Sequence, residues 1–269
     1  MLKQNILLWY YKNMNISQKN ISIIIFIVSV LIFGYFLYKN KPISREISSV
    51  SESNLKMIKI NEETDYTIAT GEYPEFSNTT IEFNKKIADI VKNSIKEQSI
   101  NSEDNWTARF ETKSPDDKIE KIPSKEERFQ LESSVRIIRN DKEVISFILD
   151  IYEFSGGAHG NSSIYTFNYN VVNQKEIILK DVSNGDQNFL KKVSDKTRDI
   201  LKKDLAKRAE VAPEDFGSEM LYSGTEPNGE NFSLFTLPEE GKITFHFPPY
   251  QVAPYVFGAS EVNLDLPLK

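Results

Sequence analysis

The longest uncharged apolar stretch of the chain runs from Ile21 to Tyr38. As a helix it would extend about 27 Å, close to the roughly 30 Å hydrocarbon core of a bilayer. Its apolar character continues around the whole circumference, whereas helices buried in soluble proteins usually keep a polar face. The pattern therefore predicts a transmembrane helix over residues 21–38.

The pattern of side chains changes directly after this helix. Residues 39–61 are polar and rich in serine, without a regular apolar period, and this composition predicts a flexible stalk. A first strand is expected over residues 66–73, broken by Gly71 and by Pro74.

A helix and three strands are expected next. Four apolar residues recur at the spacing of one helix face: Ile87, Ile90, Val91 and Ile95. Strands are expected over residues 106–112, 129–138 and 144–154. In the second of these, apolar and polar side chains alternate, which indicates a strand with one buried face. Asn140-Asp141-Lys142 supplies a hairpin turn before the third.

A similar order of elements recurs in the second half of the chain. The expected elements are strands over 165–171 and 177–179, an amphipathic helix over about 187–206, and a hairpin of 232–237 and 242–247. The repetition predicts an α+β fold of two small units, each an antiparallel sheet with a helix. We place the two domains at 62–155 and 156–269.

Charge is distributed unevenly along the chain. Residues 1–38 carry three lysines and no acid, whereas the remaining body carries 30 Lys and Arg against 39 Asp and Glu, a formal charge of −9. Such an acidic body argues against nucleic-acid binding and favours a cationic partner. A short basic start before an apolar run is typical of an uncleaved signal anchor. We therefore expect residues 1–20 in the cytoplasm and the body on the outer side of the cell membrane.

The chain has two histidines and no cysteine. His246 shares a strand face with Lys242 and Thr244, so we expect it to face solvent. His159 lies within a glycine cluster, with Gly156, Gly157 and Gly160 within five positions. Such glycines permit either a tight turn, held by a hydrogen bond from the imidazole, or a nest of backbone N–H groups that binds an anion. We expect the plain turn and keep His159 as a candidate ligand-binding residue.

The catalytic and metal-binding signals are weak. His159, Asp150 and Glu153 form the nearest set of metal ligands, but 150 and 153 have opposite parity in a strand and face opposite ways. The same parity argues against a glycosidase that uses this carboxylate pair. The familiar serine-hydrolase, zinc-protease and phosphate-loop motifs are absent. We expect no metal, no cofactor and no catalytic residue.

A second motif, Pro248 to Gly258, contains three prolines and three aromatic residues. Prolines favour a stiff, extended path, so Tyr250 and Tyr255 are either packed across a sheet or held out as contact residues. Rigid tyrosines make good anchors at interfaces, and both are candidate ligand-binding residues.

These motifs resemble a known family. Ser155 to Asn161, Leu179-Lys180-Asp181-Val182 and Pro249 to Gly258 are similar to the paired extracytoplasmic domains of the anti-sigma factor RsiV. The first unit also resembles the region that precedes the catalytic module of the peptidoglycan deacetylase PdaC. The resemblance covers roughly residues 62–267 and implies a body outside the cytoplasm, because in RsiV such a body is a lysozyme receptor.

The expected function is therefore a membrane-anchored binding or sensing module for a cell-envelope ligand, either a cationic lysozyme-like protein or peptidoglycan. Residues 1–20 are short for an anti-sigma domain, and no deacetylase module follows the second unit, so we expect neither of those activities in this chain. The alternatives are a cell-wall enzyme that uses His159 with an unidentified carboxylate, and a purely structural envelope protein.

Overall fold

The computed structural model describes residues 54–111, 122–156 and 159–268, apart from the side chains of residues 109–111. All of them belong to one compact unit, Ile47–Lys269. The predicted cytoplasmic segment, the predicted span and most of the predicted stalk lie outside this part of the chain. Among the described residues, no helix is both long and apolar enough to cross a bilayer.

The larger sheet has six strands in the order β1-β2-β3-β4-β5-β6. They are β1 (Leu55–Glu63), β2 (Thr67–Phe76), β3 (Phe129–Asn140), β4 (Val144–Phe154), β5 (Asn161–Asn170) and β6 (Lys175–Glu176). The α+β class with two sheet units is confirmed, but this sheet is mixed rather than antiparallel because β2 and β3 run parallel. Parallel neighbours need a long crossover, and here helix α3 lies between them in the chain.

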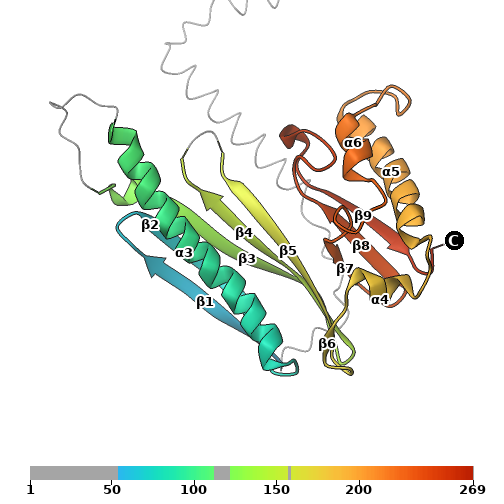
Figure 1. Ribbon diagram of the computed structural model, residues 1–269, viewed down its shortest axis with the longest axis horizontal. Coiled ribbons are helices and arrows are strands. Elements are labelled where there is room, and N and C mark those ends of the chain that lie inside the picture. Colours follow the sequence, from blue (N-terminus) through green and yellow to red (C-terminus); the bar gives the residue numbers. More distant parts are fainter. Residues whose placement is uncertain (1–53, 112–121, 157–158, 269) are drawn as a thin grey trace, which may run out of the picture. The chain divides into compact units, whose positions relative to one another are not determined.

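Helix α3 (Ile81–Glu111) covers one face of this sheet (Figure 1). Its buried positions recur every three or four residues: Phe83, Ile87, Val91, Ile95, Gln98, Ser102 and Trp106. The expected strand over 106–112 is wrong, because Trp106 continues this stripe. Gln98 and Ser102 interrupt its apolar character, but their side chains are satisfied by Ser155 Oγ at 3.1 Å and by the Gln98 carbonyl oxygen at 2.5 Å.

The boundaries of the first unit differ from those predicted. β1 occupies the end of the segment 39–61 predicted as a stalk, because Ile60 is buried on a strand whose apolar residues are interleaved with lysines. β2 continues through both Gly71 and Pro74. Strands β5 and β6, which we placed in the second domain, pair with β4 and complete the first sheet.

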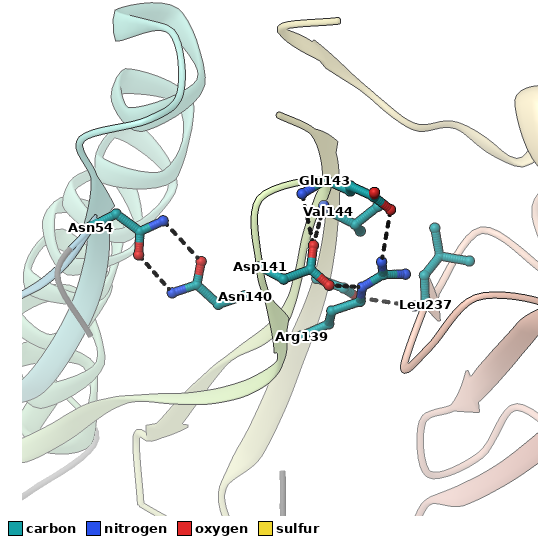
Figure 2. A network of polar contacts seen from close by, with 8 residues as sticks. Asn54, Arg139, Asn140, Asp141, Glu143, Val144 and Leu237 are labelled. Carbon is teal, nitrogen blue, oxygen red and sulfur yellow. Dashed lines mark hydrogen bonds and ion pairs between the residues drawn. The ribbon is translucent and has the colours of Figure 1, made fainter. Parts of the chain in front are cut away.

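The predicted turn between β3 and β4 is confirmed and is held by Asp141 (Figure 2). Asp141 Oδ1 accepts the N–H groups of Glu143 and Val144, each at 2.8 Å, and Oδ2 accepts Arg139 Nε at 2.5 Å. Burial alone would raise the pKa of Asp141, but these hydrogen bonds outweigh it and lower the pKa below its ordinary value. The turn is therefore fixed by a charge-assisted network.

The smaller sheet has three antiparallel strands in the order β7-β8-β9. These are β7 (Phe235–Thr236), β8 (Lys242–Phe247) and β9 (Ser260–Asp265), and the helices nearby are α4 (Leu179–Ser183), α5 (Phe189–Arg208) and α6 (Glu219–Gly224). The predicted hairpin and the predicted helix over 187–206 are confirmed. Ile243, Phe245 and Phe247 pack on one face with buried residues of α5 and α6 to form a second core. Figure 1 shows these two helices beside the smaller sheet.

Buried polar groups join the two sheets. Asn168 Nδ2 on β5 donates to the Phe235 carbonyl oxygen on β7 at 2.7 Å, and Asn168 Oδ1 accepts the Ser146 hydroxyl at 2.7 Å. The same Ser146 oxygen accepts the Leu237 N–H at 2.9 Å, and Thr166 Oγ1 accepts the Phe235 N–H at 3.1 Å. The polar face of the larger sheet, opposite α3, therefore holds the edge of the smaller one.

Candidate functional site

The three ligand-binding candidates from the sequence lie together. The ring of His159 stacks on that of Tyr255 with centroids 4.2 Å apart and planes at 15°. Tyr250 contacts Tyr255 with centroids 5.5 Å apart and planes at 34°. Two motifs that are distant in the sequence thus form one group of rings.

The turn around His159 packs closely against a neighbouring side chain. Nδ1 of His159 donates to the Gly160 carbonyl oxygen at 2.8 Å, which is the hydrogen bond expected of a tight turn. A Cβ on Gly160 would lie 2.3 Å from the ring of Tyr152, so only glycine lets this tyrosine pack here. Gly156 has a φ of +82°, as a tight turn requires, whereas Gly157 lies outside the described residues.

Tyr250 is held in an unusual backbone conformation. Its φ is +70°, a region that costs a bulky residue about 1–2 kcal/mol. Its side chain is nevertheless 57% exposed, so no burial of the ring offsets this cost. We call the exposed group Tyr152, His159, Tyr250, Tyr255 and Val256 the aromatic patch; Val256 at its end is 87% exposed.

A pocket of about 370 Å³ lies between the two sheets. We call it the inter-sheet pocket. Ser134 and Arg136 of β3 and Asp150 of β4 line one side, and His246 of β8 and Glu261 of β9 line the other. It shares the β4 face with the aromatic patch, because Asp150 and Tyr152 are two residues apart, or about 7 Å along the strand.

The expectation that His246 faces solvent is wrong. Its side chain is 4% exposed, with Nδ1 donating to Glu261 Oε1 at 3.2 Å and Nε2 lying 2.8 Å from Thr236 Oγ1. The reason is tertiary: the face of β8 that carries His246 is covered by the larger sheet, and Arg136 of that sheet pairs with Glu261. A two-stranded hairpin considered alone leaves one face exposed to solvent, whereas a face that packs against a second sheet is buried.

The hydrogen bond from His246, supported by one from Arg136, lowers the pKa of Glu261 from 4.5 to about 2. Because folding depresses this pKa, ionised Glu261 stabilises the fold above about pH 4.5, and the contribution is lost as the pH falls towards 2. The carboxylate is about half exposed, so solvent screening reduces the effect to about 1–2 kcal/mol.

Replacing Glu261 by Gln should therefore lower the free energy of unfolding by about 1–2 kcal/mol at pH 7, and the difference from wild type should vanish near pH 2. Urea unfolding at a series of pH values measures this difference. Asp265→Asn removes an exposed acid from the same strand and is the control. A difference that stays constant from pH 7 to pH 2 would show that the Glu261 charge is not responsible.

Asp150 was weighed in the sequence only as a metal ligand beside Glu153 and His159. The structure confirms that Asp150 and Glu153 face opposite ways: Asp150 lines the inter-sheet pocket, whereas Glu97 on α3 acts on Glu153. Burial raises the pKa of Asp150; a hydrogen bond with Ser162 opposes this and the Glu132 charge adds to it. No group of three or more potential metal ligands occurs among the described residues.

Asp150, Arg136, His246 and Glu261 come from four strands of two sheets, so no spacing along the chain relates them. The available signal was strand parity, which places Ser134 and Arg136 on one face of β3 and Asp150 on one face of β4. Parity does not say which strands pair or what covers that face.

Comparison with known proteins divides the chain in two. Residues 60–162 match the family model described as deacetylase PdaC, and residues 180–266 match that of a protein family of unknown function, DUF3298. A curated relative, the peptidoglycan-N-acetylmuramic acid deacetylase PdaC of Bacillus subtilis, is 30% identical over 137 residues, or 51% of this chain. The match spans only 28% of the length of that relative. The predicted family resemblance is thereby confirmed.

Solved structures extend the likeness to the fold. A DUF3298 family member from Bacteroides fragilis covers 78% of this chain and 89% of its own, with a TM-score of 0.50 at 19% identity. A DUF3298 family protein from Pseudomonas aeruginosa covers 79% of this chain and 90% of its own, with a TM-score of 0.46 at 15% identity. The first of these supports the fold described above.

Proposed function

We propose, from the premise that this chain belongs to the family that pairs a PdaC domain with a DUF3298 domain, that it is a cell-envelope binding module. In this proposal residues 21–38 anchor the chain in the cell membrane, residues 1–20 lie in the cytoplasm, and the body binds a ligand outside. The ligand is a lysozyme-like protein or peptidoglycan, as the resemblance to RsiV and PdaC implies.

The observation that carries the proposal is the aromatic patch. His159, Tyr250 and Tyr255 come from the glycine turn and the proline-rich segment, yet their rings contact one another, and Tyr152 of β4 packs beside the same turn at Gly160. The backbone strain at Tyr250 costs free energy, and burial of the ring does not offset this cost because the ring is exposed to water. Exposed, rigid aromatic rings are the residues that most often dominate binding energy at interfaces.

The charge of the body favours a cationic protein over the glycan as the ligand. A formal charge of −9 beyond residue 38 attracts a basic partner over a distance set by the ionic strength. A lysozyme-like protein fits this charge, and peptidoglycan remains the second candidate because the B. subtilis relative is named as a deacetylase of it.

An enzyme that uses His159 receives less support. Among the described residues, the contacts of His159 are with the Gly160 carbonyl oxygen and the Tyr255 ring, and neither is an acid. A histidine base usually needs a carboxylate to orient it. The deacetylase activity belongs by name to a relative of which this chain matches only a part.

Retention assays test the proposed function. The full chain in detergent micelles, immobilised on a surface, should retain hen egg lysozyme or should sediment with purified peptidoglycan. Tyr255→Ala should weaken the retained interaction about tenfold or more, because Tyr255 contacts both His159 and Tyr250.

Tyr222→Ala is the matched control, because this tyrosine is 49% exposed on α6 and lies outside the patch. An equal loss of binding in both variants, or no retention of either ligand by wild type, would contradict the proposal.

A further inference from the structure

The inter-sheet pocket contains one acid whose charge has no counterpart. Arg136 and Glu261 pair with each other, and both nitrogens of His246 are engaged by Glu261 and Thr236. Asp150 Oδ1, by contrast, is buried and has no hydrogen-bond partner among the described residues. A buried acceptor left without a partner costs about 1–3 kcal/mol, more when it is charged.

The surroundings of Asp150 make this site attractive to a cation. Glu132 lies near enough to disfavour its charge, and Ser162 supplies the hydrogen bond to the carboxyl group. The raised pKa of Asp150, which burial causes, is the response of a carboxylate that lacks a counter-ion. A ligand with a positive charge would donate a hydrogen bond to the unpartnered carboxylate oxygen. It would also offset the cost of burying the carboxylate charge.

The rest of the lining is apolar apart from Ser260. Ile148 and Ile164 flank Asp150 on the larger sheet, and Ala259 precedes β9 of the smaller one. The pocket of about 370 Å³ has space for several water molecules, each of which occupies about 30 Å³ in the liquid. A long side chain with an apolar stem and a charged end matches such a lining, since lysine and arginine bury their stems on apolar surface.

We propose that the inter-sheet pocket receives a lysine side chain of a protein ligand, with its ammonium donating to the carboxylate of Asp150. Lysine fits better than arginine because only one carboxylate oxygen lacks a partner, whereas the guanidinium fork favours two parallel acceptors. The proposal rests on the proposed function and names its ligand as a basic protein. A partner seated on the aromatic patch is close enough to insert a side chain here, since Asp150 and Tyr152 share one face of β4.

Small amines test the pocket without any protein partner. The full chain in detergent micelles is titrated with n-butylammonium chloride, n-butylguanidinium chloride and n-butanol at constant ionic strength, and binding is followed by the melting temperature and by NMR. Butylammonium should raise the melting temperature more than butylguanidinium, and butanol should have little effect. Asp150→Asn should weaken butylammonium binding about fivefold or more.

Two further variants make the result specific. Glu132→Gln removes a neighbouring exposed acid and should keep at least half of the butylammonium response. Ser134 pairs with Asp150 across β3 and β4 at an exposed position, so Ser134→Trp should fill the pocket and abolish the response while Asp150 remains. This second variant decides the question if Asp150→Asn does not fold.

Equal responses to butylammonium and butanol, or an unchanged response in Asp150→Asn and Ser134→Trp, would overturn the proposal. N-acetylglucosamine that binds in place of the amine would also overturn it, since it would assign the pocket to a glycan. Lysozyme retention without any amine response would refute the lysine pocket alone. An amine response without retention of lysozyme or peptidoglycan would refute the proposed function and leave the pocket as a cation site.

Discussion

Replacing Gly71 by Ala should lower the free energy of unfolding by about 4 kcal/mol or more, enough to unfold much of a marginally stable protein. Gly71 lies in β2 with a φ of +115°, a conformation that side chains rarely adopt. A Cβ there would lie 1.9 Å from the Ser133 carbonyl oxygen and 2.8 Å from Ser133 N. Both of these are backbone atoms of β3, so no side-chain rotation relieves the clash.

The clash falls on the parallel pairing of β2 with β3, which includes Gly71 opposite Ser133. The alanine variant must separate these two strands locally or change the path of β2. Urea unfolding of the full chain in detergent, followed by far-UV circular dichroism, measures the loss. Gly229→Ala is the control and should change stability by less than about 0.5 kcal/mol, because a Cβ at Gly229 meets no atom within 4 Å. Equal stability of the two variants would mean that β2 does not follow this path.

Replacing Asn168 by Ala should cost about 3 kcal/mol, because its side chain is 4% exposed and serves both sheets. The variant leaves the Phe235 carbonyl oxygen on β7 without its donor and the Ser146 hydroxyl without its acceptor. It should also displace the smaller sheet, which carries His246 and Glu261. Butylammonium binding should therefore weaken together with stability.

Asn161→Ala at an exposed position of the same strand is the matched control and should be nearly neutral. Ser146→Ala completes a double-mutant cycle with Asn168→Ala. Its coupling energy should reach about 1 kcal/mol, since the two side chains share one buried hydrogen bond. Additive effects would show that the two side chains stabilise the protein independently. The hydrogen bonds between the two sheets would then not form a coupled network.

Local periodicity predicted those helices and strands in which the apolar residues mark the buried face clearly, whatever packs against that face. Helix α5 has apolar residues at both ends of its buried stripe, with Ser194 and Thr197 between them, and it was predicted correctly. Strand β8 alternates clearly at Ile243, Phe245 and Phe247 and was also predicted correctly. Helix α3 was predicted only in its first half because Gln98 and Ser102 are polar residues at buried positions. Nothing local reveals that Ser155 lies opposite Gln98 and satisfies it.

The candidate site was predictable in part for the same reason. The glycine turn and the proline-rich segment each have an unusual composition, so His159, Tyr250 and Tyr255 were named from the sequence. Their stacking depends on how β4, β5 and the segment after β8 pack, which no local pattern encodes. The position of His246 was predicted wrongly because an alternating strand marks two faces and does not say what covers the second.

The sequence by itself determined the apolar segment 21–38, the acidity of the body, the α+β class and the two motifs that carry the aromatic residues. These properties depend on composition and on periods of two or 3.6 residues, which are local. Only the tertiary structure decided that one face of the larger sheet meets the smaller sheet. That contact buries His246 and pairs Arg136 with Glu261, and Asp150 Oδ1 is left without a hydrogen-bond partner in the described part of the chain. Charges from four strands meet only when the strands are packed together.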